Sequence, residues 1–79
     1  MDWSDHELLV TIGRNLTAER KRRGLTQEQV AQRINMSMQQ YSRIERGEHD
    51  TGITKYVRAA DAIEMPLIEL FRGLTEASG

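Results

Sequence analysis

The sequence of 79 residues contains no cysteine, only one proline and only four aromatic residues. The absence of cysteine excludes a disulfide framework and any metal site with thiolate ligands. No apolar run approaches the roughly 20 residues that a membrane-spanning helix needs, and the acidic first residues lack the pattern of a signal peptide. We therefore expect one cytoplasmic domain, without contact to a membrane, whose small core benefits from association with a second copy.

Charge is unevenly distributed along the chain, although the net charge is only −1. Residues 14–46 hold eight Lys and Arg against three acids, a net charge of +5, whereas residues 1–13 and 47–79 each sum to −3. A basic centre between acidic ends suggests one surface for a polyanion. The same distribution also fits an ordinary solvated surface.

The residue patterns needed for catalysis or metal binding are missing. His6 and His49 lie far apart in the sequence, and neither has a ligand pattern around it. The chain also lacks a nucleophile–base arrangement and a glycine-rich phosphate loop. We expect no enzymatic activity, no metal, no cofactor and no small-molecule ligand.

Apolar residues recur at helical spacing, and no strand pattern is present. The sequence predicts five helices, at about 5–23, 27–34, 38–46, 52–63 and from near 66 onward. Thr26 and Gln29 form a capping box before the second helix, and Thr51 would cap the fourth. Ser37 and Gln40 repeat the capping box eleven residues after the first. Two capped helices joined by a turn of about three residues are typical of a helix-turn-helix.

The segment LTQEQVAQRINMSMQQYSRIERG, residues 25–47, resembles the helix-turn-helix of the lambda-repressor-like, Xre/Cro family of DNA-binding regulators. A second segment, AADAIEMPLIELF at residues 59–71, is similar to the family's fourth helix, turn and fifth helix. The resemblance implies an all-α, compact five-helix domain that occupies residues 1–79. In length and single-domain form the chain also resembles controller proteins of restriction–modification systems.

This resemblance implies a sequence-specific transcriptional regulator that binds double-stranded DNA as a homodimer and reads a pseudo-palindromic operator. The third predicted helix would be the recognition helix in the major groove, where Arg can pair with guanine and Gln with adenine. The residues expected to contact bases are Met38, Gln39, Ser42 and Arg43. The residues expected to contact phosphates are Gln27, Ser37, Arg46 and Arg22.

An acid in the recognition helix should repel DNA, yet Glu45 falls on the side of that helix that holds Tyr41 and Ile44. In the resembling family this acid pairs with an arginine of the first helix, and the matching residue here is Arg20. We therefore expect a structural ion pair between Arg20 and Glu45. The neighbouring residues 21–23 would either contact the DNA backbone or remain solvated.

The fifth predicted helix offers a surface for dimerisation. Leu67, Leu70 and Phe71 share one face, which would dock the helix on its own core and leave Ile68 outside. The residues expected at the dimer interface are Ile68, Phe71, Leu74 and Met65. An alternative function is an antitoxin-like protein-interaction module for which DNA binding is secondary.

Overall fold

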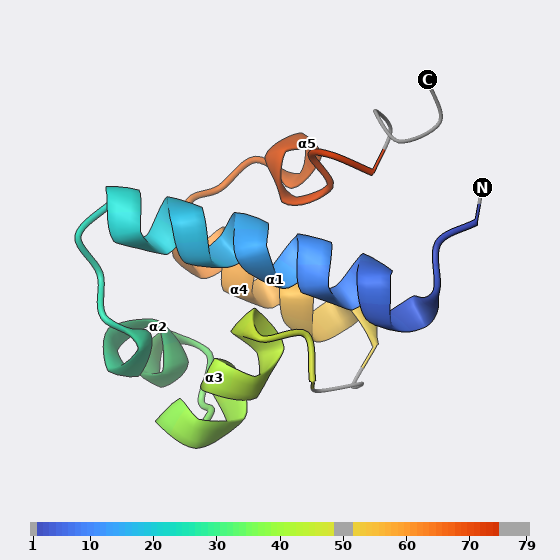
Figure 1. Ribbon diagram of the computed structural model, residues 1–79. Helices are drawn as coiled ribbons and strands as arrows, with labels where there is room; N and C mark the ends of the chain where they lie inside the picture. Colours follow the sequence, from blue (N-terminus) through green and yellow to red (C-terminus); the bar gives the residue numbers. More distant parts are fainter. Residues whose placement is uncertain (1, 49–51, 75–79) are drawn as a thin grey trace.

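The computed structural model describes residues 2–48 and 52–74, and these ranges contain five α-helices (Figure 1). The helices are α1 (Asp5–Arg22), α2 (Gln27–Arg33), α3 (Met38–Glu45), α4 (Ile53–Ala62) and α5 (Leu67–Leu70). In Figure 1 α1 crosses the middle of the molecule, with α5 above it, α2 and α3 below it and α4 behind it. The predicted all-α, five-helix class is confirmed.

Side-chain caps start the first three helices. Ser4, Thr26 and Ser37 each accept a hydrogen bond from the backbone N–H of the third helical residue, whose own side chain returns to the backbone N–H of the cap. The boxes before α2 and α3 are those that the sequence predicts, and the structure adds a third before α1. α4 begins after Gly52, which provides no side-chain cap. The expected cap, Thr51, lies outside the described residues.

One hydrophobic core joins the five helices. α1 packs against α3, α4 and α5, while α2 packs against α3 and α4. The largest side chains that are fully buried are Leu16, Val30, Tyr41, Ile44, Tyr56, Ile63 and Leu70. Because α3 contributes only its inner side to this core, its other side is left for solvent or a ligand.

α5 is short, and it sits differently on the core from what the helical spacing predicts. Leu70 is fully buried and Phe71 is partly buried, but Leu67 remains 48% exposed. The expectation that Leu67 docks the helix on its own core is therefore wrong. Besides the buried Leu70, a polar contact holds α5: the side-chain amide of Asn15 in α1 donates hydrogen bonds to the carbonyl oxygens of Leu70 and Arg72, at 2.8 and 2.9 Å.

Candidate nucleic-acid interface

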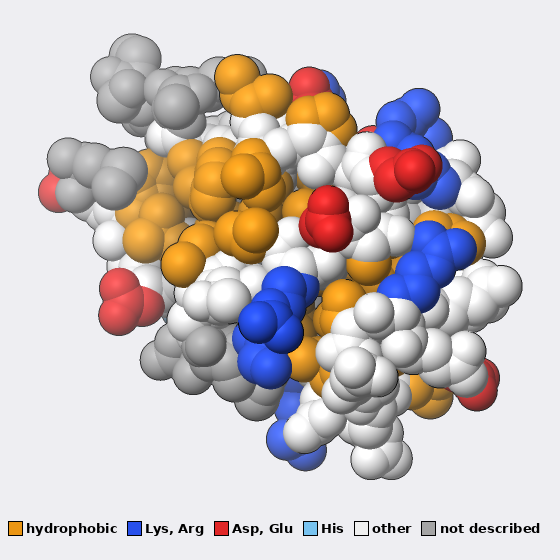
Figure 2. Space-filling view, turned by 180° about the vertical axis from the view of Figure 1, so that it is seen from behind, with side chains coloured by type: hydrophobic (Ala, Val, Ile, Leu, Met, Phe, Trp, Pro, Cys, Tyr) orange, Lys and Arg blue, Asp and Glu red, His pale blue; other side chains and the backbone are white. Residues whose placement is uncertain are grey.

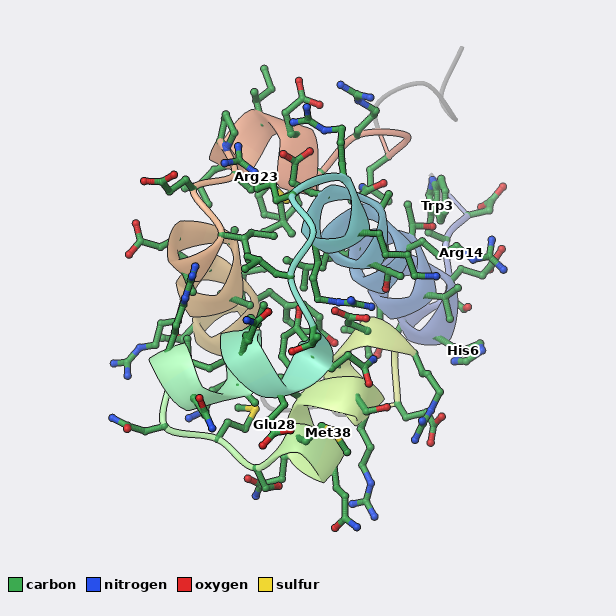
Figure 3. The ribbon with its side chains drawn as sticks, turned by 90° about the vertical axis from the view of Figure 1, so that its left-hand side faces the viewer. Trp3, His6, Arg14, Arg23, Glu28 and Met38 are labelled. Carbon is green, nitrogen blue, oxygen red and sulfur yellow. The ribbon has the colours of Figure 1, made fainter. Side chains whose placement is uncertain are left out.

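α3 is clearly two-sided. Its inner side chains Tyr41 and Ile44 have no exposed surface. On the outer side Met38 is 49% exposed, and Gln39 and Arg43 are exposed as well. Figure 3 shows Met38 in the lower half of the molecule, near Glu28, where α3 begins. Three of the four side chains expected to read bases thus form one accessible face of a helix, while the fourth, Ser42, is half-buried.

The two arginines at this end of the domain differ in their partners. Arg43 has no carboxylate within ion-pair distance among residues 2–48 and 52–74. Arg46 instead donates hydrogen bonds to the carboxylate of Glu48 and, at 2.8 Å, to the hydroxyl oxygen of Ser42. Arg43 can therefore engage an incoming acceptor directly, whereas Arg46 must exchange an existing partner.

Glu45 lies on the inner side of α3 and forms a buried, two-point ion pair with α1. Arg20 Nε lies 2.7 Å from Glu45 Oε2, and Arg20 Nη2 lies 3.1 Å from Glu45 Oε1. The two side chains are only 10% and 3% exposed. Arg20 Nη1 also donates to the carbonyl oxygen of Leu25, at 2.8 Å. Such parallel N–H···O bonds between guanidinium and carboxylate are both strong and geometrically demanding.

Two further side chains donate to the same carboxylate. Thr17 Oγ1 in α1 and Gln27 Nε2 in α2 each lie 3.0 Å from Glu45 Oε1. Burial by itself raises the pKa of Glu45, but the hydrogen bonds from Arg20, Gln27 and Thr17, together with the nearby hydroxyl of Tyr41, outweigh it and hold that pKa below its ordinary value. The carboxylate is therefore ionised at neutral pH, and it ties α1, α2 and α3 together.

The hydroxyl of Tyr41 lies buried beside this network. No atom in the described part of the chain lies in hydrogen-bonding geometry with this hydroxyl. Burial, reinforced by the nearby charge of Glu45, raises the pKa of Tyr41 far above its ordinary value. Tyr41 is therefore a neutral part of the core and takes no part in the charge of the outer face.

Comparison of the sequence with models of known protein families identifies the family of this chain. The family model HTH_3, described as Helix-turn-helix, matches residues 16–70, which include α2, α3 and α4. The chain belongs to the Xre/Cro, lambda-repressor-like helix-turn-helix family. Members of this family bind DNA and are not enzymes, and both expectations are thereby confirmed. No curated protein matches the chain.

Neither a membrane-spanning helix nor a candidate metal site is found among the described residues. None of the helices in residues 2–48 and 52–74 has the length and apolar character of a membrane span. The same two ranges hold no group of three or more His, Asp or Glu side chains that could bind a metal ion.

In this helix-turn-helix, Gln27 and Ser37 stand at the starts of α2 and α3. One amide N–H of Gln27 is taken by Glu45, which leaves its second N–H free to donate. Ser37 Oγ accepts the backbone N–H of Gln40 at 3.1 Å, and its own hydroxyl hydrogen is not needed for that cap. Each side chain can therefore keep its structural role and still offer one donor to a phosphate oxygen.

Arg22 and Arg23, at the end of α1, lie away from this surface. Arg22 is paired with Glu19 and lies in a shallow hollow beside α5, together with Glu69 and Arg72. α5 and α3 lie on opposite sides of α1 (Figure 1). Arg23 also pairs with Glu19, at 2.7 Å, and Figure 3 shows it far from Met38. This placement disfavours the expected contact of Arg22 with a phosphate on the DNA bound by α3.

The four residues expected at a dimer interface lie in unlike environments. Met65 is only 6% exposed, and Phe71 and Leu74 pack partly buried against the same core. Because these three side chains serve the fold of a single copy, little of their surface is left for a partner. Ile68, by contrast, is 81% exposed and adjoins the half-exposed Leu67.

Apolar side chains also gather on the face of the molecule shown in Figure 2. A groove of about 270 Å³ on the domain is lined mainly by apolar residues of α1 and α4, including Leu8, Leu9 and Ile53. Ile53, the first residue of α4, is 50% exposed, so the rest of the domain covers only part of its side chain. Exposed apolar surface of a small domain is thus present on α4 as well as on α5.

Proposed function

We propose that this protein is a sequence-specific transcriptional regulator that binds operator DNA as a homodimer, with α3 of each copy in a major groove. The observation that carries the proposal is the two-sided α3. Its outer face presents Gln39 and Arg43, whose side chains have no partner to displace among residues 2–48 and 52–74, while its inner side is held to α1 through Glu45. Both properties are needed, because base readout requires accessible side chains on a firmly held helix.

Base discrimination comes chiefly from Arg43 and Gln39. A guanidinium can donate two parallel hydrogen bonds to guanine O6 and N7, and a glutamine amide can pair with adenine N6 and N7. Met38, at the start of α3, is suited to contact a thymine methyl group through its apolar thioether. Ser42 is half-buried and accepts a hydrogen bond from Arg46, so its contribution to base discrimination is small.

Phosphate contacts set the orientation of the domain on the duplex. Gln27 and Ser37 supply one side-chain donor each, from the starts of α2 and α3. Arg46 joins them when it releases Glu48, because the phosphate offers its guanidinium a competing negative charge. Contacts of this kind carry no sequence information, but they supply much of the affinity and make it depend on salt.

Dimerisation places two copies of α3 about 34 Å apart, so that they reach successive major grooves on one side of the duplex. We assign the two-fold contact to the exposed pair Leu67 and Ile68 on α5. A two-fold interface is self-complementary, so one exposed apolar patch on each copy is sufficient to build it. The other three residues, Met65, Phe71 and Leu74, then pack in or against the core of their own copy and hold α5 in place.

Selection of bound sites from a random duplex library, at fixed salt, tests the function directly. We expect a pseudo-palindromic site whose half-site centres are separated by one helical turn, about 34 Å. A pool without any enriched sequence would refute sequence-specific recognition. A single, unrepeated half-site would refute the dimeric mode while leaving DNA recognition intact.

Arg43→Ala tests base reading on the selected duplex. We expect the free energy of binding to that duplex to weaken by about 1–3 kcal/mol, with relaxed preference at one base pair in each half-site. Arg22→Ala is the matched control, because it also removes one positive charge but does so on the side of α1 that faces α5. If Arg43→Ala weakened binding to selected and random duplexes equally, Arg43 would be a phosphate contact and not a reader of bases.

A further inference from the structure

A stripe of α1 residues lies against the C-terminal end of α3. Gly13, Thr17 and Arg20 follow one another at i, i+4 and i+7, which places them on one face of the helix. Thr17 and Arg20 both donate hydrogen bonds to the carboxylate of Glu45. Gly13 has no side chain to donate, and it is buried against the last backbone carbonyls of α3.

The approach at Gly13 leaves no room for a side chain. A β-carbon at this position would lie 2.4 Å from the carbonyl oxygen of Glu45 and 2.8 Å from that of Ile44. Carbon and oxygen atoms in proteins ordinarily approach to no less than about 3.3 Å. The atoms in the way belong to backbone, so no side chain can rotate aside. α3 itself would have to move by on the order of 1 Å.

A second glycine completes the close contact from the other helix. Gly47, directly after the cap of α3, has a φ of +73° and sits against the backbone of α1. A β-carbon there would lie 2.7 Å from the backbone nitrogen of Val10 and 2.8 Å from its Cα atom. The crossing of α1 with the end of α3 is therefore backbone against backbone on both sides.

We propose that Gly13 is a specificity-determining positioning residue, whose missing side chain sets how far α3 stands from the body of the domain. This inference rests on the proposed function of α3 as the reader of bases. Hydrogen bonds to base edges keep their strength only over a few tenths of an ångström, and such sites must be held to within about 0.5 Å. A movement of α3 by on the order of 1 Å takes the guanidinium of Arg43 out of two-point contact with a base. Electrostatic attraction to phosphates is much less sensitive to the same movement.

The test compares Gly13→Ala with Gly24→Ala. Gly24 has a φ of +72°, and a β-carbon there would meet no atom within 4 Å, so its substitution strains the backbone without pressing on α3. Alanine favours a helix more than glycine does, so helix propensity cannot explain a loss at position 13. The measurement is the ratio of affinities for the selected duplex and a random duplex. Because an unfolded fraction lowers both affinities by the same factor, this ratio is independent of stability.

For Gly13→Ala we expect the ratio to fall at least about tenfold, the loss of one base contact, whereas Gly24→Ala should keep it within about twofold. Without DNA, the backbone amide NMR resonances of α3 should shift in Gly13→Ala and remain in place in Gly24→Ala. An unchanged ratio for Gly13→Ala would overturn the proposal. So would a variant that stays unfolded at saturating selected duplex, because the close contact would then serve folding alone. Failure of the proposed function would be recognised separately, since the unmodified protein itself would show no preferred sequence.

Discussion

Glu45→Gln isolates the charge of the buried ion pair, because glutamine keeps the shape of glutamate. Glu45 is only 3% exposed at its side chain, and Arg20 is only 10% exposed. The substitution leaves the guanidinium of Arg20 buried without a counter-charge, which commonly costs about 3–5 kcal/mol. At roughly 0.05–0.15 kcal/mol per residue, a domain of this size has only about 4–12 kcal/mol of stability in total. Glu45→Gln should therefore remove a large share of the free energy of unfolding.

Thermal unfolding followed by circular dichroism measures this loss. For a domain of this length each kcal/mol corresponds to roughly 4–8 °C, so we expect the midpoint to fall by at least about 12 °C. Glu48→Gln is the control, since its ion pair with Arg46 is more than half exposed on both sides. Exposed pairs contribute little, and we expect that variant to change stability by less than about 0.5 kcal/mol.

DNA binding separates the structural role of Glu45 from a simple charge effect. Glu45→Gln removes a negative charge from α3, and Glu48→Gln removes one just after its end. Electrostatics alone therefore predicts tighter binding to DNA for both variants. We expect Glu45→Gln to bind its selected duplex more weakly instead, because the recognition helix loses its attachment to α1. A melting midpoint within about 2 °C of the unmodified protein would refute the reasoning, since it corresponds to less than about 0.5 kcal/mol.

Two further predictions concern assembly and acid. Ile68→Glu should shift the protein from dimer to monomer in sedimentation at micromolar concentration, and should lower affinity for a full site far more than for a half-site. A variant that remained dimeric would move the interface off α5. Because the pKa of Glu45 is lowered in the folded state, its contribution to stability is present above the unfolded value of about 4.3 and is lost as the pH falls through the folded value. Denaturant unfolding between pH 7 and pH 2 should therefore show a shallower acid loss for Glu45→Gln, and parallel curves would contradict this assignment.

Features that depend only on neighbouring residues could be predicted from the sequence. The caps at Thr26 and Ser37 act on backbone groups only three residues away, so their pattern predicts where α2 and α3 begin. Helical spacing likewise separates Tyr41 and Ile44 from the outer face of α3. Family resemblance, carried by residues 25–47, was enough to anticipate the DNA-binding class and the partner of Glu45.

Which of these helix faces are covered, and by which residues, depends on how the helices pack and could not be predicted from the sequence. Helical period relates a residue to the axis of its own helix, but the angle and distance at which helices cross depend on the whole core. Arg22 therefore turned out to lie beside α5, and Leu67 remained exposed while Met65 became buried. The backbone contact at Gly13 gave no sequence signal at all, because a glycine inside a helix shows that a side chain is absent but not which atoms fill its place.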